Sequence, residues 1–544
     1  MGKYIIAGSS LLIVIAILYS YFFIPYPDSK YLPLYALFSL GRISIVFLIS
    51  LAFGIVVGVF SAVNKAAGKI ITPIFDILQS VPILGYFPIL LVAIIAAIPG
   101  YFGRELAVWV LLFTAMEWSI FFGVVGAIRA IPPSVKEAAS TFNIRGYAYF
   151  RNVIVPAIVP ALISASTLAW NDGWTFDIAA EFVSYNGQDY SVRGIGSFIA
   201  NSSLVNQNLE AAWTGLLLVG GIVILTNQVI WHRLADTVST RKPIFSVHIP
   251  ERVVHPLRVV RMPARRIFGL RFRVEFLGLS RFKNSFPTRI VAISFLATLA
   301  ALGIASNLSS IVPSFYVISQ TMKEVDPFQT VLFTLFTLGR LFVVYIAALF
   351  VSLTAAALAS SGSKTFRKFF YTIYDIGRAI PYLALFPPLF ATLVQVIPGE
   401  SGLEISSFFL IFMGMIWYII YNVVVAASYL PQELNELSSI FGFKGLRRLR
   451  DIIIPSVLPA IVTGSILAWG GGWNVIIYSE YITQGNKVYS LPGLGFLLNQ
   501  AANEGNSSLV IFYLFIMSGI VILIGRIVWR RLIERVERRG LELI

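Results

Sequence analysis

The 544-residue chain is 57% hydrophobic and only 12% charged, whereas soluble domains carry about 25% charged residues. Its mean hydropathy of +0.82 and net charge of +15 indicate a membrane protein rather than a soluble domain. The absence of cysteine excludes disulfides and thiol chemistry, and the three histidines, His232, His248 and His255, lie in a basic polar stretch that does not suit a metal cage.

Twelve apolar runs, each near the roughly 20 residues needed to cross the hydrocarbon, follow one another along the chain. They are predicted at residues 4–23, 43–64, 77–99, 106–128, 152–180, 211–231, 290–308, 341–360, 379–398, 405–427, 452–479 and 507–525. The first run ends before Tyr-Pro-Asp and not at a small-residue cleavage site, so an uncleaved helix is favoured over a signal peptide. The predicted fold class is an all-α integral membrane protein.

Basic residues gather between the apolar runs. Residues 232–287 carry twelve Lys or Arg against three acidic residues. If even-numbered connections are cytoplasmic, this stretch falls inside with the other basic clusters, at Lys65 and Lys69, 129–151, 364–378, 444–450 and from Arg526 onward. The positive-inside rule then predicts a multi-pass protein of the cell membrane with both termini in the cytoplasm. Beside membrane spans, these basic runs indicate contact with anionic lipid rather than with nucleic acid.

The chain consists of two copies of one module. A shift of 299 residues superposes the halves and aligns several prolines, glycines, tryptophans and acids, including Pro82 with Pro381, Asp76 with Asp375, Glu137 with Glu436, Trp170 with Trp469 and Glu181 with Glu480. We therefore expect a first half at 1–231, a cytoplasmic linker at 232–287 and a second half at 288–544. Six spans per half give both halves the same orientation, so they should pack about an axis along the membrane normal with one pathway between them.

A polar segment interrupts each half between its fourth and fifth spans, at 131–155 and 430–454. In the first, Pro132 and Pro133 end one helix, and Ser134 with Glu137 predicts a capping box that begins a short new helix. The second segment lacks the serine but keeps the glutamate and the closing prolines. Each segment is predicted to form a short cytoplasmic helix between two spans; the alternative is a plain hairpin in which the glutamate only caps a helix.

These segments resemble the EAA loop of binding-protein-dependent ATP-binding-cassette importers. Glu137, Ala138 and Ala139 match its Glu-Ala-Ala, while Asn143 replaces the glycine that follows; Asn tolerates a left-handed backbone, so the turn is expected to persist. The second copy has Glu436, Leu437, Ser438 and Gly442 at these positions. The resemblance implies that residues 132–146 and 431–445 are coupling helices that dock on two cytosolic ATPase subunits.

The resemblance extends to the nitrate, sulfonate and taurine branch of these permeases, through residues 80–90, 168–182, 379–390 and 467–481. It implies the type I importer permease fold with about twelve transmembrane helices in two six-helix halves, an external substrate-binding protein and a small anionic cargo moved by alternating access. The chain has no Walker sequence, so ATP and Mg²⁺ are expected on the partner subunits, with no cofactor and no catalysis on the chain itself.

Ionisable residues inside spans are costly and suggest functional sites. Arg42 and Arg340, aligned at the outer start of the second span of each half, either attract an anion at the external mouth or form salt bridges to Glu181 and Glu480; the salt bridges are favoured. Three further acids, Glu117, Asp172 and Asp177, occur only in the first half. They either pair with arginines or face a cationic or neutral cargo.

The aligned tryptophans Trp170, Trp174, Trp469 and Trp473 either line a cavity or pack and anchor helices, and both alternatives stay open. Gly-x-Gly at 194–196 and 493–495 lacks the context of a nucleotide site. Two alternative functions are an ion-coupled secondary transporter and a membrane enzyme or scaffold. Neither explains two loops of the EAA type.

Overall fold

The computed structural model describes residues 2–239 and 325–534, apart from 187, 361–363, 429, seven positions between 431 and 444, 486 and 533. The chain divides into two units, Met1–Arg241 with Glu324–Ile544, and Lys242–Lys323. The second unit lies outside the described residues, as do most of the predicted linker and the whole predicted span at 290–308.

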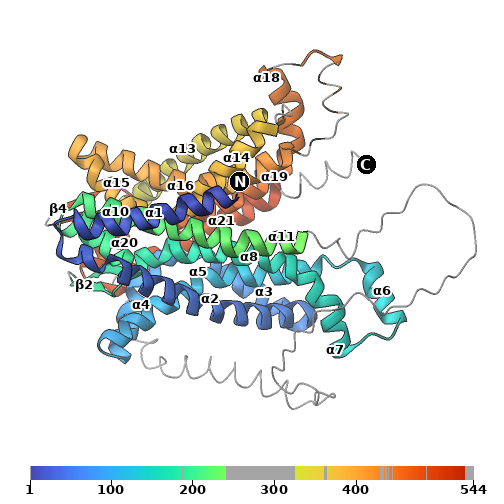
Figure 1. Cartoon of the computed structure of the whole chain (residues 1–544), viewed down its shortest axis with the longest axis horizontal. Helices are drawn as coiled ribbons and strands as arrows, with labels where there is room; N and C mark the ends of the chain where they lie inside the picture. Colours follow the sequence, from blue (N-terminus) through green and yellow to red (C-terminus); the bar gives the residue numbers. More distant parts are fainter. Residues whose placement is uncertain are drawn as a thin grey trace, which may run out of the picture. The chain divides into compact units, whose positions relative to one another are not determined.

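The first half is helical except for one hairpin (Figure 1). Its elements are α1 (Gly2–Phe22), η1 (Pro27–Tyr31), α2 (Leu32–Val63), α3 (Lys65–Gln79), α4 (Ile83–Ala97), α5 (Tyr101–Arg129), α6 (Pro133–Thr141), α7 (Gly146–Tyr149), η2 (Phe150–Ile154), α8 (Val155–Glu181), β1 (Phe182–Tyr185), β2 (Gln188–Ser191), α9 (Ile195–Ala200), η3 (Asn201–Val205), α10 (Leu209–Thr226), η4 (Asn227–His232) and α11 (Arg233–Ser239).

The second half repeats the order from the second helix onward. Its elements are α13 (Pro327–Ser360), α14 (Lys364–Ala379), α15 (Tyr382–Val396), α16 (Glu400–Ser428), α18 (Gly445–Arg448), η6 (Leu449–Ile453), α19 (Ile454–Ser479), β3 (Tyr481–Gln484), β4 (Lys487–Ser490), α20 (Leu494–Asn503), α21 (Ser507–Ile524) and η7 (Gly525–Trp529). The match of α2 to α13, α5 to α16, α8 to α19 and α10 to α21 confirms the duplicated all-α membrane fold.

The described residues contain nine helices long and apolar enough to cross a membrane, or up to eleven if each of two bent pairs counts as one span. The bent pairs correct the prediction of continuous spans at 77–99 and 379–398. Helices α3 and α4 meet at 96°, and α14 and α15 meet at 80°. Pro82 and Pro381 stand at the N-caps of α4 and α15, where proline ends the preceding helix and begins the next.

Within each half, the long helices pack closely along glycines, with α5 between α2 and α8, and α16 between α13 and α19. A Cβ on Gly173 of α8 would lie 1.9 Å from Cε of Met116, and one on Gly472 of α19 would lie 2.2 Å from Cε of Met415. Both pairs are related by the repeat. The glycines between the tryptophans therefore admit a methionine from the neighbouring helix.

The two halves interlock through the short helices that follow the bends. Helix α4 of the first half packs against α19, α20 and α21 of the second, and α15 of the second half packs against α8, α9 and α10 of the first. This reciprocal exchange gives the interface an approximate two-fold symmetry, as expected for tandem repeats of the same orientation.

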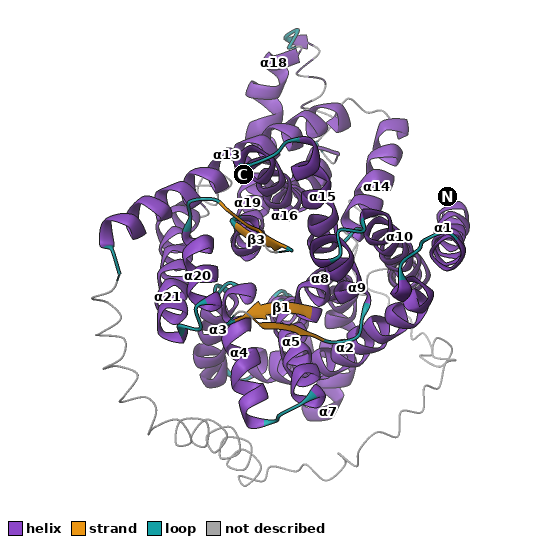
Figure 2. Cartoon of the chain, turned by 90° about the vertical axis from the view of Figure 1, so that its left-hand side faces the viewer, coloured by secondary structure: helices purple, strands orange, loops and turns teal. Residues whose placement is uncertain are grey.

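Two hairpins, β1–β2 and β3–β4, follow α8 and α19 and lie near the centre of the ring of helices (Figure 2). Each bonds to the opposite half: the Asn186 amide donates to the Ala502 carbonyl (3.0 Å), and the Gly485 amide donates to the Leu204 carbonyl (2.7 Å). We call this the hairpin end of the bundle. Helices α6, α7 and α18 project from the other end, which we call the loop end (Figure 1).

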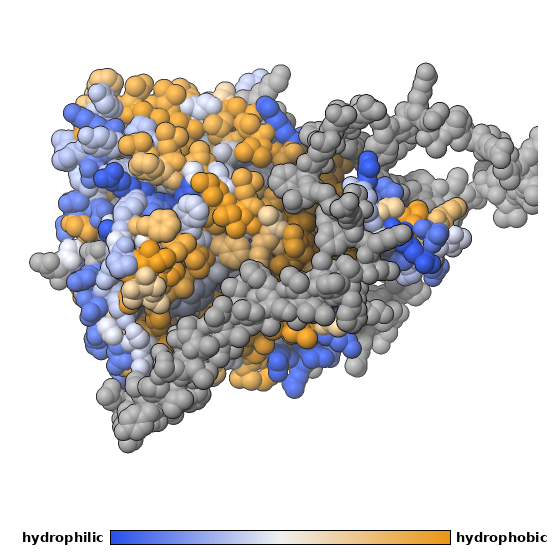
Figure 3. All heavy atoms as spheres, turned by 90° about the horizontal axis from the view of Figure 1, so that it is seen from below, coloured by the Kyte–Doolittle hydropathy of each residue, from blue (hydrophilic) through white to orange (hydrophobic). Residues whose placement is uncertain are grey.

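The surface matches a bilayer. On the face shown in Figure 3, hydrophobic side chains cover the middle of the described surface and hydrophilic ones gather toward its two ends. Large apolar side chains such as Leu48, Phe350 and Phe515 are exposed on the transmembrane helices α2, α13 and α21. Lipid can cover such side chains, so the chain is a multi-pass membrane protein.

Candidate functional site

A buried ion cluster lies at the hairpin end of the first half, centred on Arg42 of α2. Its guanidinium makes a two-pronged contact with Glu105 of α5, with both N–O distances at 3.0 Å. It also pairs with Asp177, at 3.4 Å, and with Glu181, both of α8. The Arg42 side chain is only 3% exposed, and buried charges of this kind are stable only when paired.

Glu181 joins this cluster to the turn that begins α9. Its Oε2 accepts hydrogen bonds from the amides of Gly196 (2.6 Å) and Ser197 (3.1 Å). Its Oε1 accepts one from Ser39 Oγ, which in turn accepts from the Ile195 amide (3.0 Å). The carboxylate therefore ties α2, α8 and α9 together.

The second half repeats the arrangement around Arg340. The arginine contacts Glu404 (2.9 and 3.2 Å) and Glu480 (2.6 Å). Glu480 accepts from Thr337 Oγ1 (2.8 Å) and from the Gly495 amide (2.7 Å). Ile476 stands where the first half has Asp177, so the second cluster has one acid fewer.

The recurring Gly-x-Gly forms the socket for these carboxylates. A Cβ on Gly194 would lie 1.8 Å from Oε1 of Glu181, and one on Gly493 would lie 2.1 Å from Oε2 of Glu480. No side chain fits there without displacing the glutamate. The Gly-x-Gly motif of each half therefore leaves space for a buried carboxylate of the same half. That carboxylate belongs to Glu181 in the first half and to the aligned Glu480 in the second.

Arg42 and Arg340 thus form the salt bridges to Glu181 and Glu480 that the sequence favours over an exposed anion site. Both arginines hold helices together at the hairpin end. Asp177 belongs to the first cluster, so one of the three extra acids pairs with an arginine. Asp172 interacts electrostatically with Arg378 of α14, in the opposite half. Glu117 of α5 is buried, and within the described part of the chain neither of its carboxylate oxygens has a hydrogen-bond partner.

The four tryptophans contribute to packing. Trp170 donates to Thr226 Oγ1 (3.2 Å) and stacks edge-on against Phe47. Trp174 and Trp473 are almost completely buried, and Trp469 contacts Tyr345 and Trp529. None of the four lines either of the two cavities that are described below.

At the loop end, the first predicted coupling segment forms α6. Pro132 is its N-cap and Pro133 its first residue, and no side chain caps it, so the predicted capping box of Ser134 and Glu137 is wrong. A proline at the first position needs no cap for its missing N–H. Glu137 and Ala138 are exposed, whereas Ala139 is buried against the bundle.

Helix α6 ends in a left-handed turn at Asn143 (φ 52°), where the Ile144 amide donates to the Ala139 carbonyl (2.8 Å). The turn expected at this asparagine is therefore present. In the second segment, Gly442 has φ 64° and the Phe443 amide donates to the Ser438 carbonyl (2.8 Å). Glu436 is exposed and Ser438 buried, while Leu437 lies outside the described residues.

An exposed aromatic ring precedes each left-handed residue. Phe142 is 76% exposed and its repeat partner Phe441 is 62% exposed. Neither ring lies on a lipid-facing transmembrane helix, because both belong to the segments that project at the loop end. Apolar surface of this kind, held by a defined turn, suits a protein contact.

A first cavity lies between the halves at the hairpin end and is lined by α4, α8, α15, α19, α20 and both hairpins. Its two walls differ. Ala179, Phe182, Ala200 and Leu204 of the first half align with Tyr478, Tyr481, Asn499 and Asn503 of the second, so one wall is apolar and the other polar. Burial raises the pKa of the Tyr481 hydroxyl, which therefore stays protonated.

Several residues of the site were missed from the sequence. Glu105 and Glu404 align at the shift of 299 residues, and Ser39 and Thr337 align at 298, so the repeat itself carried the signal. Arg378 has no such signal, because the aligned residue is Gln79. The hairpins were also missed, although the dipeptide Asn186-Gly187 is typical of hairpin turns.

Two homologous halves that interlock around a shared interface, with projecting helices at one end, define a two-half membrane permease. The chain belongs to the family of binding-protein-dependent transport system inner membrane components, whose model matches residues 54–242 and again residues 348–540. The family domain is thus present twice in one polypeptide, and the chain is a transport subunit.

The chain is similar to permeases that are named for nitrate, bicarbonate and taurine. The nitrate import permease protein of Synechococcus elongatus is 31% identical over 171 residues, which make up 31% of this chain and 57% of that protein. The bicarbonate transport system permease protein of the same organism is 29% identical over 161 residues, 30% of this chain and 54% of that protein. The taurine transport system permease protein of Escherichia coli is 23% identical over 197 residues, 36% of this chain and 69% of that protein. The chain therefore spans little more than half the length of the first two.

Proposed function

We propose that this chain is the transmembrane permease component of an ATP-driven importer of a small oxyanion, with residues 1–231 and 288–544 as its two halves and 232–287 as the connection between them. One observation carries the proposal. Each of the two halves that the family model matches has an exposed segment at the loop end, and each segment contains a residue with a left-handed backbone. In the proposal, two cytosolic ATP-binding-cassette subunits dock there, and an external binding protein docks at the hairpin end.

The cargo is assigned from the relatives and from the electrostatics. The proteins similar to this chain are named for nitrate, bicarbonate and taurine. The acids at the interface do not contradict an anion, because Asp177 is paired with Arg42, and Asp172 interacts with Arg378. A nitrate-sized, sulfonate-sized or similar oxyanion is the proposed cargo.

In the proposed cycle, movement at the loop end opens and closes the hairpin end, which gives alternating access. Closure of the ATPases on ATP moves the two coupling segments together, and the interlocked halves transmit this movement to the hairpins. The hairpin end then opens to the docked binding protein, and hydrolysis returns the pathway to the cytoplasmic side. Both termini and the linker face the cytoplasm, as the positive charge indicates. ATP and Mg²⁺ bind to the partner subunits.

The test is affinity purification of the tagged chain in mild detergent, followed by mass spectrometry and an ATPase assay. We expect about two ATPase subunits per chain, since the chain carries two coupling segments, and a co-purifying binding protein. Glu137→Ala and Glu436→Ala are measured singly and together. We expect the double variant to lose most of the ATPase, and the single variants to differ, because the two segments depart from the motif at different residues.

Absence of any ATPase under gentle conditions would overturn the proposal. Uptake that follows an ion gradient in liposomes without ATPase would then identify a secondary transporter. Equal losses from the two single variants would contradict unequal coupling while leaving the importer intact.

A further inference from the structure

A second cavity lies between the halves, farther from the hairpin end. It is lined by Thr167 and Asn171 of α8, and Asn171 lies roughly 10 Å along the helix from Ile178 of the first cavity. The end of α10 and η4 also line it, and α14 of the opposite half completes it. Its volume is about 60 Å³. Since one water needs roughly 10–15 Å³, the cavity holds a group of several oxygens.

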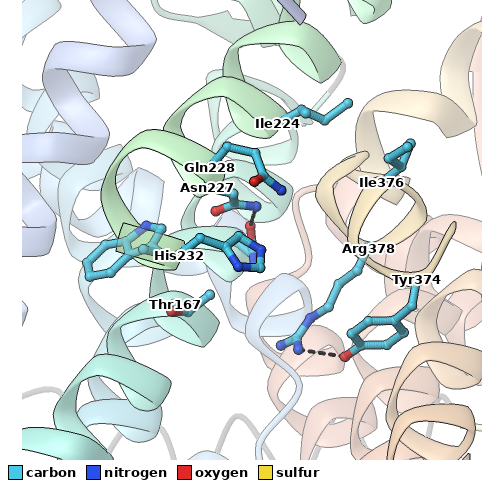
Figure 4. A pocket seen from close by; sticks show the side chains of 10 residues that line it. Thr167, Ile224, Asn227, Gln228, His232, Tyr374, Ile376 and Arg378 are labelled. Carbon is cyan, nitrogen blue, oxygen red and sulfur yellow. Dashed lines mark hydrogen bonds between the residues drawn. The ribbon is translucent and has the colours of Figure 1, made fainter. Parts of the chain in front are cut away.

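The lining of this cavity is apolar in part, but several of its side chains carry hydrogen-bond donors. Asn227, Gln228 and His232 face it from the first half, and Tyr374 and Arg378 from the second (Figure 4). Asn227 Nδ2 donates to Asn171 Oδ1 at 3.0 Å.

Arg378 supplies the charge. One of its guanidinium nitrogens donates to the Tyr374 hydroxyl at 2.8 Å. Among the carboxylates whose positions the structure describes, none lies within 4.0 Å of the guanidinium. Arg42 and Arg340 differ in this respect, since both are saturated by glutamates. Arg378 therefore keeps donors available to a ligand in the cavity.

Four of the polar residues that line this cavity have a different residue at the aligned position of the other half. At the same shift, Thr167 aligns with Ile466, Asn171 with Gly470, Tyr374 with Phe75 and Arg378 with Gln79. The repeat preserves what the fold needs, as in the two ion clusters. These four side chains differ between the halves, and they lie on both walls of one cavity. We therefore attribute them to the pathway and not to the fold.

The geometry points to a binding site for a small oxyanion in this cavity, with the Arg378 guanidinium as the charged anchor and the amides of Asn171, Asn227 and Gln228 as neutral donors. The site would hold the cargo after it leaves the binding protein, and the inference rests on the proposed function. A planar guanidinium donates to two oxygens of one anion at once, which suits this role.

Asp172 limits the affinity. It lies on α8 beside Asn171 and interacts electrostatically with Arg378. A like charge near the anion weakens its binding. A transport site needs such limited affinity, because the cargo must leave it again. Removing this carboxylate should therefore tighten anion binding, whereas a purely structural Asp172–Arg378 interaction predicts no gain.

The experiment measures anion binding on the purified full-length chain without partners, by thermal stability in titrations of sodium nitrate, bicarbonate and methanesulfonate against sodium chloride at constant ionic strength. We expect saturable stabilisation by at least one oxyanion. A charge-assisted contact is worth about tenfold or more in affinity, so Arg378→Gln should weaken binding by about that factor. Asp172→Asn should tighten it. Gln79→Ala, at the position aligned with Arg378, is the matched control and should leave binding unchanged.

Equal binding by Arg378→Gln and the wild type, or no oxyanion effect beyond chloride in the wild type, would overturn the inference. Weaker binding by Asp172→Asn would also overturn it. Arg378→Gln places the first half's own residue in the second half, and an unchanged elution profile and ATPase co-purification would show that it folds. Because binding is measured on the chain alone, its failure is distinguishable from loss of the ATPase, which tests the proposed function.

Discussion

Glu181 and Glu480 each accept hydrogen bonds from an arginine, a hydroxyl and at least one backbone amide. Gly194 and Gly493 lie against these carboxylates, and neither position has space for a side chain. The backbone at Gly194 is extended (φ 179°), a conformation open to any residue, yet the space beside it is filled by the carboxylate. A single methyl group is therefore enough to disturb the ion cluster.

Gly194→Ala and Gly493→Ala should each destabilise the protein, because overpacking a rigid site costs about 1–3 kcal/mol. Thermal unfolding of the purified chain in detergent measures the effect. Gly470→Ala is the control: a Cβ there meets nothing within 4 Å, and replacing glycine by alanine inside a helix gains about 0.5–1 kcal/mol. Equal stability of all three variants would show that the carboxylates are not held as described.

At the scale of elements, helix α6 of the first predicted coupling segment is ended by one left-handed residue, and the described part of the second segment has a left-handed residue at the aligned position. Asn143 and Gly442 occupy this position, and the residue after each of them donates its amide to the carbonyl five residues earlier. The turn sets the direction in which Phe142 and Phe441 leave the helix. The shape of the segment thus depends on a backbone conformation that β-branched residues avoid.

Asn143→Val and Gly442→Val should each distort the segment, since a left-handed conformation costs ordinary residues about 1–2 kcal/mol. We expect less ATPase to co-purify with either variant, although the spans still fold. Asn143→Gly restores the residue type of the other half and should retain the ATPase fully. If Asn143→Val bound the ATPase as well as Asn143→Gly, the turn would not be needed for docking.

At the scale of the whole molecule, the halves meet at the hairpin end through reciprocal hydrogen bonds. Asn186 and Gly505 face each other across the interface, and a Cβ on Gly505 would lie 3.5 Å from Cβ of Asn186. Disulfides join Cβ atoms about 3.5–4.5 Å apart. The absence of native cysteine makes this pair a specific place to join the halves.

The variant Asn186→Cys with Gly505→Cys should form a disulfide on oxidation, detected as loss of free thiols by mass spectrometry. Uptake into vesicles should then fall to background, because the hairpin end must open in each cycle, and a reductant should restore it. ATPase co-purification should not change. Each single cysteine variant is a control. Undiminished uptake by the oxidised double variant would mean that the cargo enters elsewhere.

Much of this architecture could be predicted from the sequence. Eleven of the twelve predicted apolar runs correspond to helices or bent pairs, and the twelfth lies outside the described residues. The bend at Pro82 was not predicted, because the apolar run from 77 to 99 includes only the end of α3, whose amphipathic sequence with Asp76 differs from that of the apolar helix α4. Arg42 with Glu181 could be anticipated because both recur in the repeat.

The second cavity could not be predicted by the same reasoning. Its residues come from α8, η4 and α14, and its charged residue departs from the repeat, so neither proximity in sequence nor duplication points to it. In the sequence, Arg378 belongs to the basic cluster at 364–378, which indicates only orientation in the membrane. Only the bend between α14 and α15 brings it to the interface with the first half.

The unequal walls of both cavities have an evolutionary consequence. A permease assembled from two copies of one gene product changes both walls of its pathway with every mutation, and a charge on its axis always meets its twin. In this chain the halves are joined, so one codon alters one wall. Selection, or a laboratory library, can therefore tune Tyr478 or Arg378 for a new cargo while Ala179 and Gln79 remain as they are.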